Sequence, residues 1–578
     1  MKKLLRLLAD YKKECVLGPL FKMLEATFEL FVPLVVKSMI DRGIGTGDRG
    51  YIVRMSLLMA LLAAIGLSCT MFAQYFAAKA ASGFSAKLRH ELMRHIQRLT
   101  YTDLDTLGTS SLITRMTSDI NQLQTGVNLT IRLLLRSPFI VIGAMVMAFT
   151  VDVKAALVFV VAIPLLSIVV FGIMLLTIPM YRKVQERLDT LTDTTRENLT
   201  GVRVIRAFRN EKAEAAEFRQ ENDLLVEMQK KVGRLSALMN PLTYVIVNFA
   251  VIALVHVGAI RVSSGILTQG AVIALYNYMS QILVELIKFA NFIITVTKAV
   301  ACGNRIQNVL ESGDPVSDDD SEPEIADENR GTVVFDRVTF TYAQAAEPSL
   351  TDISFTAKRG DVIGIIGGTG SGKSTLVNLI PRFYEPTAGT VTVDGVPVSE
   401  FPRKALRKRI GMVPQKAVLF HGTIRQNLLW GKQDATEQDL QDALKTAQAL
   451  DVVASKADGL DEMLSENGQN LSGGQRQRLT IARALVRKPE FLILDDSASA
   501  LDYATDAALR AALKELPDRP TVFIVSQRTA SIQHADRILV LDDGRLAGIG
   551  THAELLENCA VYREIHASQF PKEVRENG

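Results

Sequence analysis

The hydrophobic residues gather in the first 300 residues, in six mostly apolar stretches that are each about 20 or more residues long. A helix of that length spans a bilayer core of about 30 Å. The stretches lie near residues 15–40, 52–80, 128–150, 153–178, 238–262 and 268–296. The fourth is the clearest, because residues 155–176 contain no charged side chain. Spans one, two and six do carry charges, namely Lys22, Glu25, Glu29 and Lys37, then Arg54 and Lys79, then Glu285 and Lys288.

The links between the spans are unequal. They are short after spans one, three and five, and roughly 50–60 residues long after spans two and four. Both long links carry many charges with helical periodicity, which indicates helices that continue beyond the membrane. The positive-inside rule places these basic links and the amino terminus, with Lys2, Lys3 and Arg6, in the cytoplasm. We expect no cleavable signal peptide, since no short apolar region and small-residue cleavage site precede the first span.

The composition changes after the sixth span. Residues 311–331 are acidic, include two prolines and read as a solvated linker. Beyond them, short β-rich runs alternate with helical segments, which is typical of an α/β domain with a largely parallel sheet. The predicted fold is therefore a membrane all-α domain of six helices (1–310), an acidic linker (311–331) and a soluble α/β domain (332–578).

Charge and cysteine content exclude several classes of protein. Lys and Arg total 65 against 62 Asp and Glu, a net charge of +3, so a nucleic-acid partner is not expected. The mean hydropathy of +0.18 fits an average over one membrane part and one soluble part. Four cysteines lie far apart without a CxxC pair, which predicts neither a disulfide framework nor a zinc site.

The most specific motif is a glycine-rich loop that follows the strand-like run DVIGII and precedes a helix-compatible run. This order is that of a P-loop, whose backbone N–H groups surround phosphate oxygens at a helix amino terminus. Lys373 is predicted to reach the β- and γ-phosphates, and Ser374 to hold Mg²⁺. The predicted ATP-binding residues here are Gly367, Gly368, Thr369, Gly370, Ser371, Gly372, Lys373, Ser374 and Thr375.

Two further motifs lie in the same domain. The apolar run FLIL ends in Asp495 and Asp496, which suits a metal-associated carboxylate beside a P-loop. Leu471 begins LSGGQ, in which Ser472, Gly473, Gly474 and Gln475 open a helix. One nucleotide has no evident need for two phosphate-binding helix ends, unless the second end serves a nucleotide held by another subunit.

In the order and spacing of these motifs the chain resembles a half-transporter of the ABC exporter family, over nearly its whole length. Several single residues add to the resemblance. They are Gln415 as the Q-loop glutamine, Tyr342 as the aromatic that stacks on adenine, Ser499–Asp502 as the D-loop, Glu466 in the loop before the signature, and Phe208 in the second intracellular loop. The resemblance implies a dimer that sandwiches two ATP molecules with Mg²⁺. Each ATP would lie between one subunit's P-loop and the signature of the other, and Asp502 would belong to the partner's site. Ser374, Gln415 and Asp495 would hold the metal.

The chain departs from the family pattern at two positions. The family has Glu, the base that polarises the attacking water, where this chain has Asp496, and it has His where this chain has Gln527. The Asp side chain is one methylene shorter, which withdraws the carboxylate by roughly 1.5 Å, and a misplacement of about 1 Å costs on the order of a hundredfold in rate. Glutamine can donate a hydrogen bond but cannot become cationic or relay a proton.

These departures, beside an intact signature, lead to a hypothesis about pairing. The chain's own ATP site would bind ATP but hydrolyse it slowly, and Ser472–Gln475 would complete the competent site of an unlike partner that supplies Glu and His. Two alternatives stay open. One is a homodimeric lipid flippase in which Asp496 still works, and the other is an ATP-gated channel or regulator.

A polar stripe marks the sixth span. Asn277, Gln281, Glu285, Lys288 and Asn291 follow one another at steps of four, four, three and three, so they share one helix face. Glu25 and Glu29 of span one are also four apart. Either these side chains line a translocation cavity, or they pair between and within helices. The resemblance implies an amphipathic drug-like or lipid-like substrate, and a bacterial cytoplasmic membrane with the nucleotide-binding domain in the cytoplasm.

Overall fold

A computed structural model describes residues 2–313, 321–343 and 345–570. Its contacts divide the chain into two compact units, each of which is treated by itself. The first unit comprises the chain up to Gln97 together with Thr109–Ser312. The second comprises Arg98–Gly108 together with the chain from Gly313 onward. The short segment between residues 97 and 109 therefore belongs with the nucleotide-binding half of the chain.

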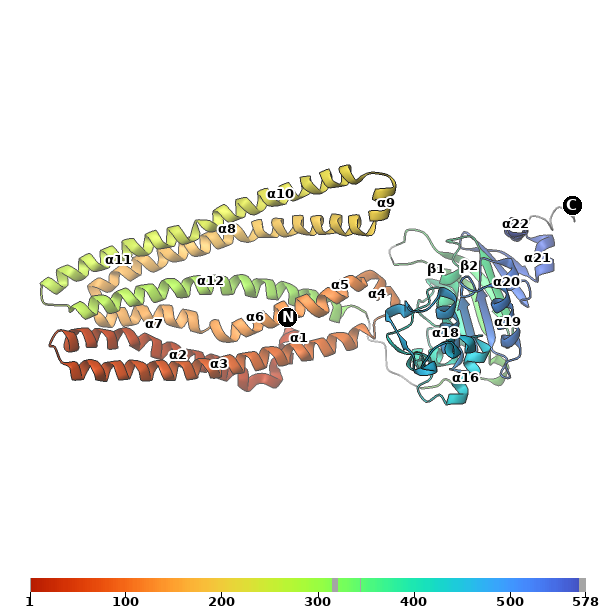
Figure 1. Ribbon diagram of the computed structural model, residues 1–578, viewed down its shortest axis with the longest axis horizontal. Coiled ribbons are helices and arrows are strands. Elements are labelled where there is room, and N and C mark those ends of the chain that lie inside the picture. The colour runs from red at the N-terminus through yellow and green to blue at the C-terminus, as the bar shows by residue number, and fades with distance from the viewer. Residues whose placement is uncertain (1, 314–320, 344, 571–578) are drawn as a thin grey trace. The chain divides into compact units, whose positions relative to one another are not determined.

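The first unit is made of long helices that run side by side (Figure 1). Two of them, α3 and α8, have 48 residues each, which corresponds to about 72 Å of helix and is more than twice a bilayer core. The long helices are α2 (Lys12–Ser38), α3 (Arg49–Ile96), α6 (Ile120–Leu133), α7 (Arg136–Val151), α8 (Val153–Thr200), α10 (Glu211–Ala237), α11 (Met239–Ser263) and α12 (Gln269–Glu311). The short ones are α1 (Lys2–Leu5), η1 (Arg6–Tyr11), η2 (Met39–Ile44), α5 (Thr109–Thr114), η3 (Arg115–Asp119) and α9 (Val202–Ala207).

Five helical stretches of the described chain are long and apolar enough to cross a membrane. They are 49–96, 109–151, 153–200, 211–263 and 269–311, and they contain the second to sixth predicted spans. The first predicted span is also helical, as α2, but it does not meet the same criterion of composition. Its 27 residues include Lys22, Glu25, Glu29 and Lys37, which lower its hydropathy.

Small residues allow the membrane helices to approach closely. On α3, the side chains of Ala73, Ala77 and Ala80 are completely buried. A Cβ atom placed on Gly126 of α6 would lie 2.3 Å from the Cβ atom of Ala299 on α12. Gly126 is therefore required by the contact between α6 and α12, since any larger residue would push the two helices apart.

The second unit contains two main sheets. The larger has the order β12-β11-β3-β10-β9-β6 and is parallel except for the β11–β12 pair, and the smaller is antiparallel with the order β2-β1-β4-β5. Strands β9 and β10 are buried along their whole length, as expected for central strands of a parallel sheet. The bounds are β1 (Val333–Phe340), β2 (Leu350–Ala357), β3 (Val362–Gly367), β4 (Ala388–Val393), β5 (Val396–Pro397), β6 (Ile410–Val413), β7 (Gly422–Thr423), β8 (Met463–Leu464), β9 (Phe491–Asp495), β10 (Thr521–Val525), β11 (Arg537–Asp542) and β12 (Arg545–Gly550).

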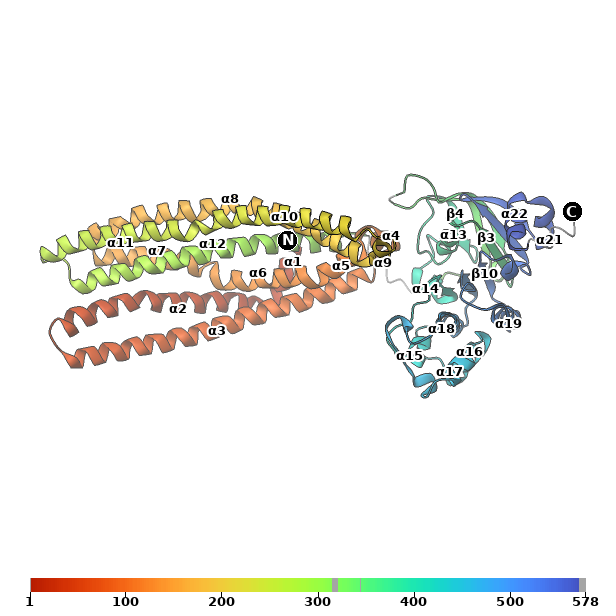
Figure 2. The same ribbon diagram turned by 45° about the horizontal axis from the view of Figure 1, so that its top comes forward.

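Helices pack on the larger sheet and form two cores, one on each face (Figure 2). One core joins the larger sheet to the smaller sheet and to α13, and the other joins it to the helical region around α16 and α18. The helices of this unit are α4 (Tyr101–Leu107), α13 (Lys373–Leu379), α14 (Arg403–Arg409), α15 (Ile424–Leu429), α16 (Glu437–Thr446), α17 (Leu450–Ala454), α18 (Gly473–Leu485), α19 (Tyr503–Lys514), α20 (Thr529–Ile532), α21 (His552–Asn558) and α22 (Ala560–Gln569), with short 3-10 turns at 327–329, 459–461 and 466–468.

Substitution of Phe523 tests how strongly the stability of the second unit depends on its central strand. The ring is completely buried on β10, so Phe523→Ala is expected to cost about 3–5 kcal/mol of stability. Trp430 is the single tryptophan and lies in this unit, so its fluorescence during urea denaturation reports on this unit in the full chain. The matched control is Ile549→Ala on the edge strand β12, where the side chain is 44% exposed, with an expected cost below about 1 kcal/mol. Equal losses in the two variants would contradict this view of the core.

Candidate functional site

The P-loop is formed where β3 ends and α13 begins. Gly370 and Gly372 adopt positive φ angles of 85° and 92°, which a residue with a side chain rarely adopts, so both turns depend on glycine. Gly372 is also the residue directly before α13. The Lys373 ammonium is buried and donates to the carbonyl oxygens of Gly367 (3.0 Å) and Gly368 (2.5 Å). The loop thus holds a cation at the amino terminus of a helix, which favours an anionic ligand.

The carboxylates predicted to act beside the P-loop are brought to it by strand order. Because β9 is parallel to β10 and β10 to β3, the carboxyl ends of these strands share one edge of the sheet. Ser374 Oγ donates to Asp495 Oδ1 over 2.9 Å. A hydroxyl and a carboxylate are oxygen ligands of the kind that Mg²⁺ prefers. These residues therefore fit ATP with Mg²⁺: Lys373 would bind phosphate oxygens, and Ser374 and Asp495 would hold the metal.

Asp496 and Gln415 lie next to this pair. Gln415 Nε2 is 3.5 Å from Asp496 Oδ2, a long contact that still places both predicted residues at one point. The backbone of Asp496 is left-handed, with φ 46°, a region that Asp tolerates better than most residues with side chains. Its N–H donates to the carbonyl of Val525 on β10. The turn after β9 is thus fixed by the neighbouring strand, and it directs the Asp496 carboxylate toward Gln415.

Burial changes the acidity of this cluster. Burial lowers the pKa of the Lys373 ammonium, and the neighbouring charges of Asp496 and Asp495 oppose that shift. Burial also raises the pKa of Asp495, where the hydrogen bond from Ser374 acts in the opposite direction and the charge of Asp496 adds to the rise. The pKa of Asp496 is raised by burial as well, against the hydrogen bond from Gln415. Additional positive charge from a metal would favour the ionised carboxylates.

Tyr342 lies close to the P-loop. Its hydroxyl is 3.0 Å from Thr375 Oγ1 of α13, and its ring contacts those of Phe340 and Tyr384 edge-on. This position, beside the phosphate loop and held by two other aromatic rings, is compatible with the predicted stacking on adenine.

The signature opens α18, as predicted. Ser472 is exposed and caps the helix: its Oγ accepts from Gln475 N, and its own N–H donates to Gln475 Oε1. Gly473 is also exposed, so the start of the helix presents backbone N–H groups outward. Asp502 caps α19 by accepting from Thr505 N over 2.8 Å. Glu466 is exposed in a single 3-10 turn before the signature.

The loop that carries Gln527 is held by residues that sequence reasoning did not identify. Gln569 of α22 donates to the Gln527 carbonyl oxygen over 2.7 Å and accepts from Thr529 N. Arg528 donates to the carbonyl oxygen of Ser499 over 3.2 Å, which ties this loop to the predicted D-loop. The Gln527 side chain itself is exposed. No local motif marks Gln569, because its role arises only when α22 folds back onto the loop.

Comparisons with known proteins match both halves of the chain. Residues 15–286 match the ABC transporter transmembrane region, and residues 350–499 match the ABC transporter family model. The chain is 35% identical to an uncharacterized ABC transporter ATP-binding protein, YfiB, of Bacillus subtilis, over 577 residues that span all of both chains. The chain belongs to the ABC transporter family. It is a multi-pass membrane protein with an ATPase domain.

Other similar proteins refine the comparison. This ABC transporter is 31% identical to a putative multidrug export ATP-binding/permease protein, YgaD, of Bacillus subtilis, over 98% of this chain and 99% of that one. It is 30% identical to an ATP-dependent lipid A-core flippase of Hahella chejuensis, over 89% and 87%. In fold it is similar to a bacterial Atm1-family ABC exporter solved with ATP bound, with a TM-score of 0.81 over 97% and 99% of the two chains and 24% identity.

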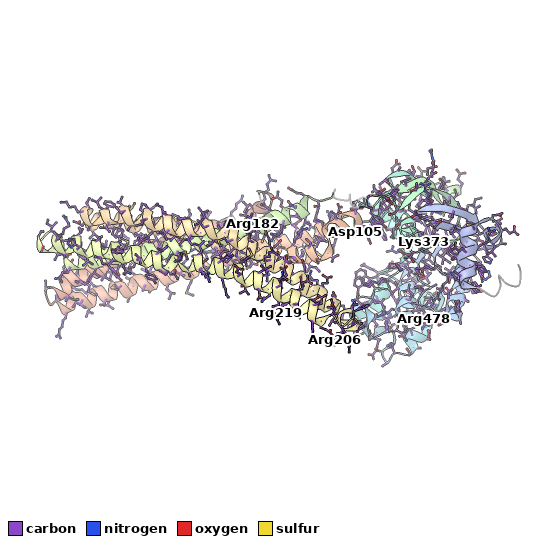
Figure 3. The ribbon with its side chains drawn as sticks, turned by 90° about the horizontal axis from the view of Figure 1, so that it is seen from above. Asp105, Arg182, Arg206, Arg219, Lys373 and Arg478 are labelled. Atoms are coloured by element: carbon purple, nitrogen blue, oxygen red, sulfur yellow. The ribbon has the colours of Figure 1, made fainter. Side chains whose placement is uncertain are left out.

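The ABC transporter contains an aromatic contact that sequence analysis did not predict. The ring of Tyr101 on α4 stacks on Phe383 with centroids 4.4 Å apart, and Tyr384 donates to Asp105 over 2.7 Å. Figure 3 labels Asp105 together with Lys373. Through these contacts the first long link packs on the segment that directly follows α13. Phe208, in the second long link, is 81% exposed.

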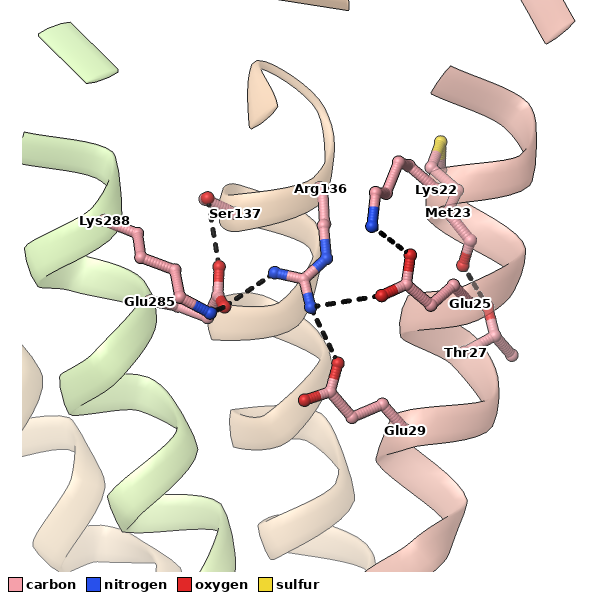
Figure 4. Close-up of polar contacts among 9 residues, drawn as sticks. All are labelled: Lys22, Met23, Glu25, Thr27, Glu29, Arg136, Ser137, Glu285 and Lys288. Carbon is pink, nitrogen blue, oxygen red and sulfur yellow. Dashed lines mark hydrogen bonds and ion pairs between the residues drawn. The ribbon is translucent and has the colours of Figure 1, made fainter. Parts of the chain in front are cut away.

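Five charged side chains surround Arg136 of α7, inside the membrane unit (Figure 4). Arg136 donates to Glu285 of α12 (2.6 Å) and to Glu29 of α2 (2.8 Å), and it lies 3.7 Å from Glu25. Lys22 pairs with Glu25, and Lys288 donates to Glu285 over 2.9 Å. Arg136 was missed because the third span was judged by its apolar residues alone, although the charge is visible in RLLLRSPF.

The polar stripe of α12 also borders a cavity of about 390 Å³. The cavity is lined by Glu29, Val32 and Pro33 of α2 and by Asn277, Ser280, Gln281, Val284, Glu285 and Lys288 of α12. Glu25 and Asn291 are not among the lining residues. The structure therefore shows both arrangements left open by the sequence: Glu285 is paired between helices, and the stripe faces a cavity.

The raised pKa of Asp495 predicts a pH-dependent stability of the ligand-free second unit. With its native pKa above the unfolded value of about 3.9, the native state binds more protons than the unfolded state between the two values. Stability from this group therefore falls as the pH rises through that interval, and the full penalty is present at neutral pH. Asp495→Asn is expected to raise the urea midpoint of Trp430 fluorescence at neutral pH and to weaken Mg²⁺-dependent ATP binding.

Asp439→Asn is a contrasting control, because a hydrogen bond from Lys488 lowers the pKa of this carboxylate. The sign is then opposite, and the substitution is expected to lower the same midpoint at neutral pH. A lower midpoint for Asp495→Asn would contradict the prediction.

Arg136 is expected to be a main source of stability in the membrane unit. Arg136→Met leaves Glu285, whose side chain is 3% exposed, without its strongest partner, and breaking such a buried pair costs about 3–5 kcal/mol. The thermal midpoint of the helical circular dichroism signal measures the loss for the purified full chain in detergent. Arg196→Met is the control, since its pair with Asp193 is more than 70% exposed and contributes at most about 1 kcal/mol. Similar shifts for both variants would refute the role of Arg136.

Proposed function

We propose that this ABC transporter is one subunit of an ATP-driven heterodimeric exporter, and that it moves amphipathic drug-like or lipid-like molecules out of the cytoplasm or the inner leaflet. In this assembly its own ATP site hydrolyses slowly, and its signature completes the site of an unlike partner. The observation that carries the proposal is the combination of Asp496 and Gln527 with an intact Ser472–Gln475, of which Ser472 and Gly473 are exposed.

The geometry supports the proposal that Asp496 is a poorly placed base at this site. Asp496 lies at the end of a turn that is fixed by the Val525 carbonyl, so the shorter side chain is not compensated by a freely adjustable backbone. Burial raises its pKa, which a water-polarising carboxylate beside bound phosphate also requires. The deficit is one of reach, roughly 1.5 Å, and on the order of a hundredfold in rate.

The substrate class rests on the relatives. One similar protein is named for multidrug export and another for flipping lipid A-core, and these names support a drug-like or a lipid-like substrate. A homodimeric lipid flippase is the second candidate. It is favoured by the flippase-named relative and by the position of Asp496 beside Gln415, which would suit a working Asp base.

ATP turnover of the purified chain separates the two candidates. The heterodimer proposal predicts low turnover for the chain alone, with little further loss in Asp496→Ala. It also predicts that Asp496→Glu combined with Gln527→His raises turnover of the self-paired chain by about a hundredfold.

Lys373→Ala, which removes the buried phosphate-binding ammonium, is the control for background ATPase activity. Turnover of the unmodified chain at ordinary exporter rates, abolished by Asp496→Ala, would overturn the heterodimer proposal and favour the flippase.

A further inference from the structure

The charges around Arg136 balance one another. Lys22, Arg136 and Lys288 supply three positive charges, and Glu25, Glu29 and Glu285 supply three negative ones. Charged groups inside a membrane are tolerated when they are paired. An added ligand that carries one net charge would disturb this balance in a low-dielectric environment, whereas a ligand with one charge of each sign would preserve it.

Two of these six charged groups keep hydrogen-bonding capacity that their present partners do not occupy. Glu29 Oε2 accepts from Arg136, and no other hydrogen bond or ion pair of the Glu29 carboxylate is present in the described part of the chain. Lys288 donates one of its three N–H groups, to Glu285, and its side chain is 48% exposed. Glu285 is saturated by contrast, because it accepts from Arg136, Lys288 and Ser137.

Both partly used charges line the same cavity, one from α2 and one from α12. Gln281 lines the same cavity, and its Oε1 atom is buried and has no hydrogen-bond partner among the described residues. Val32, Pro33 and Val284 supply apolar wall. The volume of about 390 Å³ is in the range of small-molecule sites. A carboxylate and an ammonium that each have one ion-pair partner, an unused acceptor and an apolar wall thus border one space.

We propose that this cavity binds a zwitterionic amphiphile, with its cationic group at Glu29, its anionic group at Lys288 and its apolar part along Val32, Pro33 and Val284. This inference rests on the proposed function, because the site serves transport only if the chain is an exporter. It narrows the substrate class from amphiphiles in general to those that carry both charges. Simple cationic amphiphiles are disfavoured, because Lys288 repels them and Glu29 is already partly neutralised by Arg136.

The test measures binding to the purified full chain in nanodiscs of phosphatidylglycerol, without nucleotide. The probe is radiolabelled dodecylphosphoethanolamine, and the competitors are dodecylamine and dodecyl phosphate, which share its tail but carry charge of one sign only. The zwitterion is expected to bind at least roughly tenfold more tightly than either competitor, since each competitor loses one charge-assisted hydrogen bond. Equal or tighter binding of dodecylamine would overturn the proposal.

Two variants test which charged group of the ligand each side chain binds. Glu29→Gln is expected to abolish the advantage of the zwitterion over dodecyl phosphate, and Lys288→Gln its advantage over dodecylamine. Arg136 keeps its bond to Glu285 in the first variant, and the thermal midpoint of each variant shows whether it is folded. Thr297→Ala is the control, because Thr297 is an exposed residue of α12 whose hydroxyl donates to the carbonyl oxygen of Ile293 in its own helix. Retention of the original ranking in both Gln variants would refute the assignment.

The source of the ligand is distinguished by adding phosphatidylethanolamine to the nanodiscs. Competition with the probe identifies a membrane lipid headgroup as the occupant, whereas unchanged probe binding identifies a free zwitterionic amphiphile; both results support the zwitterion chemistry. Because no ATP is used, a failure here leaves the heterodimer proposal to its own turnover assay. Failure of that assay, in turn, does not alter the measured binding order.

Discussion

A charged side chain that is buried away from water needs an ion-pair or hydrogen-bond partner, and this requirement determines contacts in both units of the chain. In the membrane unit it joins three helices, because Arg136 of α7 pairs with carboxylates of α2 and α12. In the second unit it places the Lys373 ammonium against backbone carbonyl oxygens and the Asp495 carboxylate against Ser374. Each of these contacts links residues of different elements, so the functional groups and the fold are stabilised by the same bonds.

In the proposed pairing, the nucleotide site keeps its binding residues and differs from the family pattern in its hydrolytic ones. The glycine turns, Lys373 and the Ser374–Asp495 pair fit ATP with Mg²⁺. The departures are confined to the groups that would act on water and on the γ-phosphate, Asp496 and Gln527. A subunit of this kind can close on bound nucleotide and transmit that closure to the membrane helices. In the proposed pairing, the other ATP site hydrolyses ATP faster.

Local motifs made the nucleotide site predictable. The P-loop, FLILDD and LSGGQ each specify a short turn or strand end, and parallel strand order then brings Ser374 and Asp495 together across 121 residues. All six predicted spans are helical, but α2 carries the four charges noted in the sequence and is not apolar enough to meet the criterion that the other five stretches meet. The Arg136 cluster and the Gln569 contact were not predicted. They depend on which faces of distant helices meet, and residue spacing within one helix carries no information about that.

The contact between α4 and the rest of the second unit has a consequence for biosynthesis. Asp105 and Tyr384 are separated by 279 residues, so α4 leaves the ribosome long before the surface that receives it exists. At about 5–20 residues per second, the delay is on the order of tens of seconds. During that interval Tyr101 has no stacking partner, and the membrane helices between the two segments must be inserted first. The nucleotide-binding unit is therefore completed by a piece of chain made at the start of synthesis, and a fragment beginning after residue 313 would expose Phe383 and Tyr384.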